Sequence, residues 1–139
     1  ILTIIPWSLQ AFIFIYFGWI TGILYLLASI FGISMLESQN YFSHYGLTRN
    51  KKEDGSYERV KAHHSWNSDH LLGRILLFEL TRHSDHHFMG AKPYQVLESK
   101  ADSPLLPYGY PAMLILDYFP FLFKPIMARQ LEKYSYLKS

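Results

Sequence analysis

Residues 1–36 read ILTIIPWSLQAFIFIYFGWITGILYLLASIFGISML, and none of them is Asp, Glu, Lys, Arg or His. All thirteen Lys and Arg residues and all eleven Asp and Glu residues of the 139-residue chain fall at Glu37 or later. Half of the chain is hydrophobic and 17% is aromatic, which is high for a soluble domain. This segregation of charge predicts that the N-terminal stretch lies in a membrane.

The uncharged stretch is too long for one membrane crossing and too short for two complete ones, because a crossing takes about 20 apolar residues. We therefore expect a truncated helix followed by a complete one that runs from about Ile20 to about His44. The reversal between them is expected in the segment 18–22, GWITG, since glycine adopts the backbone angles of a tight turn. A secretory signal peptide is the alternative, but the stretch lacks a basic start. It is also more than twice as long as the apolar region of such a peptide usually is.

The placement of the basic residues predicts the orientation of the chain. Every Lys and Arg follows the apolar stretch, so the positive-inside rule places the chain from about Arg49 onward in the cytoplasm. For a bacterial protein this means the inner membrane. A net charge of +2, without a basic patch interleaved with aromatic residues, argues against a nucleic-acid partner. The sequence starts at Ile1 rather than Met, and we expect the C-terminal portion of a longer multi-pass membrane protein.

The second half of the chain is predicted to be helical and to lie outside the bilayer. From Asn67 the apolar residues wrap nearly all round a helix that should reach about His87. Prolines break the stretch that follows, and a last apolar segment spans about Ala112 to Met127. Two prolines interrupt this segment, so we expect a helix on the membrane surface or under the bundle rather than a third crossing.

Three of the seven histidines lie in the segment RHSDHH, residues 82–87. On a helix with about 100° per residue, His83, His86 and His87 share an arc of about 100°, so their rings converge on one region. Three imidazoles on one face would leave too many ring nitrogens unsatisfied, and we favour metal binding over a plain polar cluster. Imidazole suits zinc, copper, iron and nickel, and a chain without cysteine cannot form a thiolate site.

A fourth candidate ligand is His44, at the end of the second predicted helix. Glu37 lies seven residues earlier, about 20° short of two full turns, so it points in the same direction as His44. Ionisable residues near a membrane usually mark a site, and Glu37 is a candidate partner of the ligands. The alternative is that Glu37 only extends its carboxylate to the interface. His70 is interpreted as structural.

Three more residues are candidate hydrogen-bond partners of the ligands. Glu79 faces the histidine side of the predicted helix and is expected to accept a bond from an imidazole N–H, or to be a ligand itself. Asp85 points about 200° away from His83, so it is expected to orient a neighbour rather than bind metal. His64 and its neighbour at position 63 point apart on a regular backbone, so His64 is interpreted as a partner of the site or as a solvated residue.

Five motifs in a fixed order are specific evidence for a protein family, whereas a single His-x-x-His-His motif would be weak evidence. Along the chain they are NYFSHYGL (40–47), GSYERV (55–60), HSWNS (64–68), RHSDHH (82–87) and LPYGYP (106–111). Over nearly the whole chain this pattern resembles the membrane alkane 1-monooxygenases. That family is similar to the xylene monooxygenases and, more distantly, to the membrane fatty-acid desaturases.

The resemblance implies an all-α membrane protein, with residues 1–43 in transmembrane helices and residues 44–139 forming the cytoplasmic metal-binding part of the same domain. It implies two non-haem irons, with His44, His83, His86 and His87 as ligands. The implied reaction is hydroxylation of the terminal carbon of an alkane or alkyl chain with O2, and the implied electron donor is rubredoxin or ferredoxin.

The chain also departs from the pattern of that family. The first two histidine boxes are missing, so we expect this chain to be inactive alone. A desaturase-like enzyme, another lipid hydroxylase on the same scaffold, and a non-catalytic truncated membrane protein are the alternatives. Membrane lipid is an expected contact in every case.

Overall fold

The computed structural model describes residues 4–135, and this part of the chain is all-helical, as predicted. It contains six α-helices and two short 3-10 helices, η1 (Ala62–His64) and η2 (Tyr94–Val96). Two isolated bridges between extended residues are the only strand-like pairing in the described range. The chain divides into two compact units, one ending at Glu37 and one beginning at Ser38.

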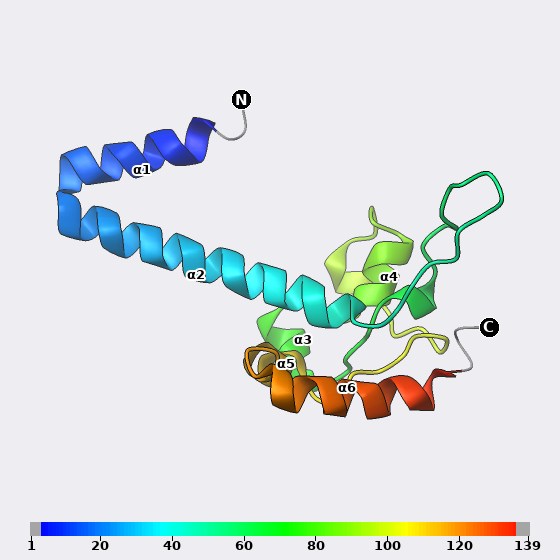
Figure 1. The fold of residues 1–139 in the computed structure, drawn as a ribbon. Helices are drawn as coiled ribbons and strands as arrows, with labels where there is room; N and C mark the ends of the chain where they lie inside the picture. Colours follow the sequence, from blue (N-terminus) through cyan, green and yellow to red (C-terminus); the bar gives the residue numbers. More distant parts are fainter. Residues whose placement is uncertain (1–3, 136–139) are drawn as a thin grey trace. The chain divides into compact units, whose positions relative to one another are not determined.

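The truncated and the complete helix that the sequence predicted are both present, and the N-terminal unit holds the first of them and most of the second. Helix α1 (Ile4–Phe17) has 14 residues, and helix α2 (Trp19–His44) has 26. Of the helices in the described range, only α2 is long and apolar enough to cross a membrane. Gly18, with φ +85°, separates the two helices, which Figure 1 shows in blue and cyan. The backbone reverses there because glycine adopts positive φ without strain.

Close packing joins α1 to the start of α2. The Gln10 side chain is buried and its Nε2 donates a 2.9 Å hydrogen bond to the Gly22 carbonyl oxygen. A Cβ atom on Gly22 would lie 2.5 Å from the Phe14 ring, so only glycine fits at this contact. Small residues and buried polar bonds are the means by which membrane helices associate, because lipid removes the hydrophobic driving force between them.

The C-terminal unit is built around a small apolar core. Its seven buried members come from the end of α2, from the loops around residues 66 and 106, from α5 (Tyr110–Leu116) and from α6 (Pro120–Lys133). They are Phe42, Trp66, Leu106, Tyr110, Met113, Phe123 and Met127. Because Phe42 lies in this core, the last turn of α2 is held against the rest of the unit. No third membrane-length helix occurs among the described residues, since α5 has 7 residues and α6 has 14.

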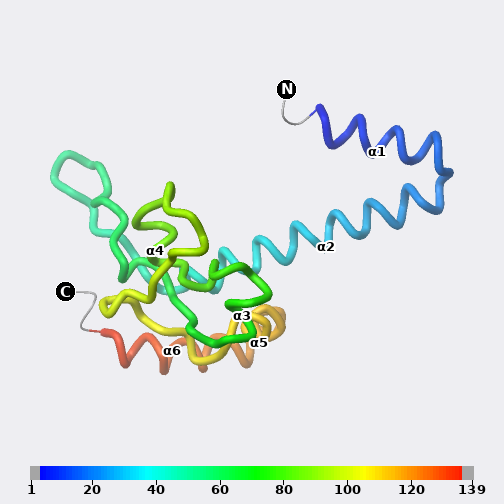
Figure 2. Tube along the Cα trace, turned by 180° about the vertical axis from the view of Figure 1, so that it is seen from behind, coloured from blue at the N-terminus to red at the C-terminus, as the bar shows by residue number. Residues whose placement is uncertain are grey.

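The single helix predicted from Asn67 to His87 is wrong. Two short helices occupy this stretch, α3 (Leu71–Leu76) and α4 (His83–Phe88), and the chain turns between them. The large apolar side chains of α3 were expected to pack on all sides, but they are 57–67% exposed: Leu71, Leu72, Ile75 and Leu76. Figure 2 shows α3, α5 and the start of α6 together at one end of this unit, and Figure 1 agrees.

The break between α3 and α4 is held by an ion pair that periodicity does not reveal. Arg74 donates from Nε and Nη2 to the Glu79 carboxylate, both at 2.8 Å, and the Glu79 amide donates to the Arg74 carbonyl oxygen. Phe78 and Glu79 have φ of 49° and 62°. A left-handed conformation costs a residue other than glycine about 1–2 kcal/mol, so these bonds offset a real strain.

Candidate metal centre

Two elements far apart in the sequence carry the clustered histidines. His44 is the last residue of α2, and His83 and His87 lie one turn apart on α4. The start of α4 is fixed by the buried Asn67, whose Oδ1 accepts hydrogen bonds from the amide and the hydroxyl of Ser84, both at 2.9 Å. Asn67 therefore holds α4 in place, a role that its position in the HSWNS motif alone did not predict.

The Nε2 atoms of the three histidines converge. The Nε2 atom of His83 lies 2.9 Å from that of His87 and 3.2 Å from that of His44. Two imidazole nitrogens bound to one ion at about 2.1 Å, with about 90–110° between the bonds, lie about 3.0–3.4 Å apart. The spacing thus matches neighbouring ligands of a single metal ion. The Nε2 atom of His83 takes part in one hydrogen bond, either as donor or as acceptor. A hydrogen bond therefore accounts for one of its two close contacts and leaves the other without an explanation.

The tautomer of His44 suits a metal ligand. Its Nδ1 lies 3.2 Å from the carbonyl oxygen of His64 and 3.4 Å from the hydroxyl of Ser65. A carbonyl oxygen only accepts, so Nδ1 carries the proton and the Nε2 lone pair faces His83. Metal-bound histidines are typically held in this way by a bond from the other ring nitrogen.

The His64 imidazole is turned away from the cluster. Its Nδ1 accepts a 3.0 Å bond from the Lys61 amide, and its Nε2 lies 3.3 Å from Glu58 Oε1. His64 therefore contacts the histidine cluster through its main-chain carbonyl rather than through its ring.

The surroundings of His83 and His87 lower the pKa of both imidazoles and so favour their neutral forms. His83 is 4% exposed, and burial, followed by the neighbouring His87, His44 and His86, lowers its pKa to about 3. Burial and the neighbours His44 and His86 also lower the pKa of His87. Neutral imidazole is the form that binds metal. Three imidazoles whose Nε2 atoms converge form a donor set that a cation satisfies, so the residues fit a metal ion.

His86 lies beside this group but outside it. Its ring centroid lies 6.1 Å from that of His83 and 5.6 Å from that of His87. The group whose ligand atoms all lie within 4.8 Å of one another consists of His44, His83 and His87. The structure therefore brings three of the four predicted ligands together, and ligation by His86 stays a prediction.

The structure pairs one of the predicted carboxylate partners, Glu79, with arginines rather than with an imidazole. The Glu79 carboxylate accepts hydrogen bonds from Arg74, and its Oε2 also lies 3.4 Å from Arg82 Nε. In the described part of the chain it therefore stabilises the turn before α4. Glu37 is exposed and belongs to the N-terminal unit, and its role stays a prediction.

Asp85 is fully buried, and its carboxylate joins α4 to the segment that follows it. We call its bonds to Lys92, Lys100 and the Glu98 amide the Asp85 lock. Its Oδ2 accepts hydrogen bonds from Lys92 Nζ at 2.6 Å and from the Glu98 amide at 2.9 Å, and Lys100 Nζ lies 3.3 Å from Oδ1. Burial raises the pKa of Asp85, but these bonds lower it by more, so its net pKa lies below the usual range. Asp85 therefore orients the whole helix that carries the histidines, rather than one imidazole.

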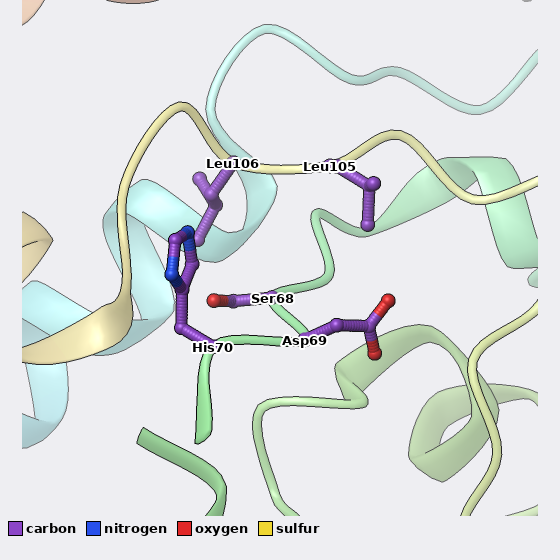
Figure 3. Close-up of a pocket in the computed structure, with 5 residues that line it drawn as sticks. All are labelled: Ser68, Asp69, His70, Leu105 and Leu106. Carbon is purple, nitrogen blue, oxygen red and sulfur yellow. The ribbon is translucent and has the colours of Figure 1, made fainter. Parts of the chain in front are cut away.

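Of the cavities in the C-terminal unit, one is lined by His44 and His87 and another by His70. The first, of about 270 Å³, is lined by His44, His64 and His87 together with Leu47, Arg49 and Val60, so the histidine cluster opens onto a space for a small molecule. The second, of about 280 Å³, is lined by Ser68, Asp69, His70, Leu105 and Leu106 and contains none of the clustered ligands. Figure 3 shows the Ser68 hydroxyl pointing toward His70 and the Asp69 carboxylate pointing away.

Comparison with known proteins gives consistent matches. Residues 1–116 match the family model described as fatty acid desaturase. Alkane 1-monooxygenase 1 of Pseudomonas aeruginosa is 43% identical over 118 residues, which are 85% of this chain and 31% of the relative. Alkane 1-monooxygenase 1 of Alcanivorax borkumensis is 40% identical over 136 residues, 98% of this chain and 33% of the relative.

A more distant match extends the same pattern. The xylene/toluene monooxygenase hydroxylase component of Pseudomonas putida is 29% identical over 94 residues, 68% of this chain and 24% of the relative. The chain spans about a third of the length of the alkane 1-monooxygenases that it matches.

Proposed function

Because the chain belongs to the fatty acid desaturase family, we propose that it is the metal-binding C-terminal part of a membrane alkane hydroxylase. The convergence of the His44, His83 and His87 Nε2 atoms carries this proposal. Relatives 40–47% identical that bear the name alkane 1-monooxygenase support the substrate class. The proposed reaction inserts one oxygen atom of O2 into a C–H bond of the terminal carbon of an alkane or alkyl chain, while the other oxygen atom leaves as water with electrons from a donor protein and protons from solvent.

The proposed cofactor is iron, two non-haem ions in the complete enzyme. His44, His83 and His87 would hold one ion, and His86 is the proposed fourth ligand of the pair. When bound, iron supplies the oxidation chemistry that an unactivated C–H bond requires and that protein side chains lack. The chain itself contributes the imidazole donors. It also contributes the His64 carbonyl oxygen, which orients His44, and the Asp85 carboxylate, whose bonds position α4.

The location of the site fits an apolar substrate. Helix α2 is long and apolar enough to cross the bilayer, and its last residue is His44. An alkane dissolves in the hydrocarbon core, so a substrate moving along the membrane reaches the end of this helix without crossing water. We place the histidine cluster on the cytoplasmic side of a multi-pass protein, the inner membrane in a bacterium, where a soluble donor such as rubredoxin or ferredoxin would deliver electrons.

The description of the matching family model favours a second candidate, a fatty-acid desaturase. The two activities differ in product, since hydroxylation adds an oxygen atom and desaturation removes two hydrogens. The identity of the product therefore separates them.

Product analysis of the full-length protein that contains this chain tests the proposal. Membranes supplied with reductant, O2 and an n-alkane should form the 1-alkanol. His83→Ala should abolish the product, whereas His70→Ala, in the separate cavity, should leave most of it. An alkene or unsaturated acyl product would favour the desaturase, and equal loss in both variants would show that the site is misassigned.

A further inference from the structure

A helix on the surface of a protein in water turns polar side chains outward, whereas α3 turns apolar side chains outward. Gly73 faces inward, and a Cβ placed on it would lie 3.2 Å from the Thr81 side chain and 3.7 Å from Tyr110 and Pro111. The outer face covers an arc of about 140° at about 100° per residue. Its members are all large and apolar: Leu71, Leu72, Ile75 and Leu76. In water such side chains belong inside, so this face calls for an apolar neighbour.

The corner between α5 and α6 carries a second group of exposed apolar side chains. They are Ile115, Tyr118, Phe119, Phe121 and Leu122, between 46% and 72% exposed. Farther along α6 the exposed positions become polar, with Arg129, Glu132 and Lys133 in place of apolar residues. The apolar exposure is therefore confined to the start of α6.

The two groups belong to one end of the C-terminal unit. Gly73 of α3 packs against Tyr110 and Pro111 at the start of α5, and Figures 1 and 2 both show α3, α5 and the start of α6 together. We call these nine residues of α3 and of the α5–α6 corner the apolar end.

A hydrogen bond joins the corner between α5 and α6 to the part of α2 that follows the uncharged stretch. Ser38 Oγ donates to Asp117 Oδ2 at 2.7 Å, and the Tyr41 ring lies 5.5 Å from that of Phe123. Ser38 follows the uncharged stretch that ends at Leu36, with Glu37 between them, so the boundary of the hydrocarbon core lies near this residue. With α2 across the bilayer, as proposed above, this bond holds Asp117 and the corner that follows it at the membrane surface.

We propose that the apolar end is a lipid-contact surface that inserts into the headgroup–acyl boundary of the membrane. The proposal rests on the proposed membrane placement of α2 and is independent of the reaction that the histidines support. Aromatic residues such as Tyr118 and Phe119 are typical of this boundary. Lys124 of α6 flanks the apolar side chains, and it suits the phosphate groups of anionic lipids.

Spin labelling tests the proposal, because a chain without cysteine accepts single engineered cysteines. Leu72→Cys, Ile75→Cys and Phe121→Cys report on the apolar end. Leu27→Cys in α2 is the lipid control, and Lys52→Cys in the polar loop is the water control. The 139-residue chain, reconstituted in phosphatidylcholine and phosphatidylglycerol vesicles, is measured for collision of each label with O2 and with a water-soluble nickel chelate.

Labels on the apolar end should collide preferentially with O2, as Leu27→Cys should, while Lys52→Cys prefers the nickel chelate. Preference for nickel on the apolar end, with Leu27→Cys still in lipid, would overturn the proposal and leave the placement of α2 intact. Exclusion of both reagents would also overturn it, because it would show a protein segment or a second copy covering the surface. If Leu27→Cys itself prefers nickel, the membrane placement of α2 fails and the proposal fails with it.

Discussion

The Nε2 atoms of His44 and His83 lie 3.2 Å apart, although 39 positions separate the two residues in the chain. One ends the membrane-length helix α2 and the other begins the short helix α4. The cluster therefore exists only while the end of α2 packs on the core through Phe42 and Asn67 holds the start of α4. Changes that loosen either helix should weaken metal binding without removing a ligand.

Removal of a clustered imidazole should weaken metal binding. Loss of a partner that merely orients a ligand lowers metal affinity about 10–100-fold, so His83→Ala should lower iron affinity by at least that much. Iron titration of the purified chain, with metal content measured after desalting, provides the test. His70→Ala is the matched control, since His70 lines the other cavity. Unchanged affinity in His83→Ala would exclude it as a ligand.

Asp85→Asn should destabilise the C-terminal unit. The substitution leaves Lys92 and Lys100 without their buried counter-charge. Removing one partner of a buried ion pair costs about 3–5 kcal/mol of folding stability. Because both lysines reach water, we expect the free energy of unfolding to fall by about 3 kcal/mol. Chemical unfolding in detergent measures it. Asp102→Asn, an exposed neighbour, should change little, and an equal effect of both substitutions would argue against the lock.

The loop from Asn50 to Lys61 should loosen in acid. Hydrogen bonds from the Lys61 side chain and the Asn50 amide lower the pKa of Glu58 to about 2, from a usual value of 4.5. A lowered pKa means that the stabilisation is complete above pH 4.5 and is lost as pH falls toward 2. Hydrogen exchange of the Asn50 amide, corrected for its intrinsic pH dependence, should accelerate across this window. Glu58→Gln should remove the dependence, and an unchanged profile would refute it.

Gly22→Leu should separate α1 from α2. A side chain there collides with the Phe14 ring, and overpacking of this kind costs about 1–3 kcal/mol. The same substitution at Gly32, where a Cβ meets nothing within 4 Å, should be tolerated. Thermal unfolding in detergent compares the two variants, and equal midpoints would mean that the close contact contributes nothing to stability.

Lys51 and Lys52 should be labelled only from the cytoplasmic side. The prediction follows from the placement of every basic residue after the apolar stretch, and both lysines are exposed. A membrane-impermeant amine reagent, applied to right-side-out and to inverted vesicles, should modify them in the inverted vesicles only. Modification in right-side-out vesicles would reverse the orientation.

The sequence by itself determined the features that local composition controls. The uncharged run up to Leu36 determined one short and one long apolar helix, because a bilayer selects on length and charge. The order of the five motifs identified the family, since it is a property of the chain and not of its packing. The angular spacing of His83 and His87 placed both on one helix face, because a single turn separates them.

Only the tertiary structure decided which side chains meet. The Arg74–Glu79 pair breaks the helix that apolar periodicity predicted and takes Glu79 away from the histidines. His44 joins the cluster because its helix end packs on the core, and a carbonyl oxygen, which has no sequence signal, sets its tautomer. These contacts join segments that are distant along the chain, and their geometry depends on the shape of the packed core, which no local pattern of residues records.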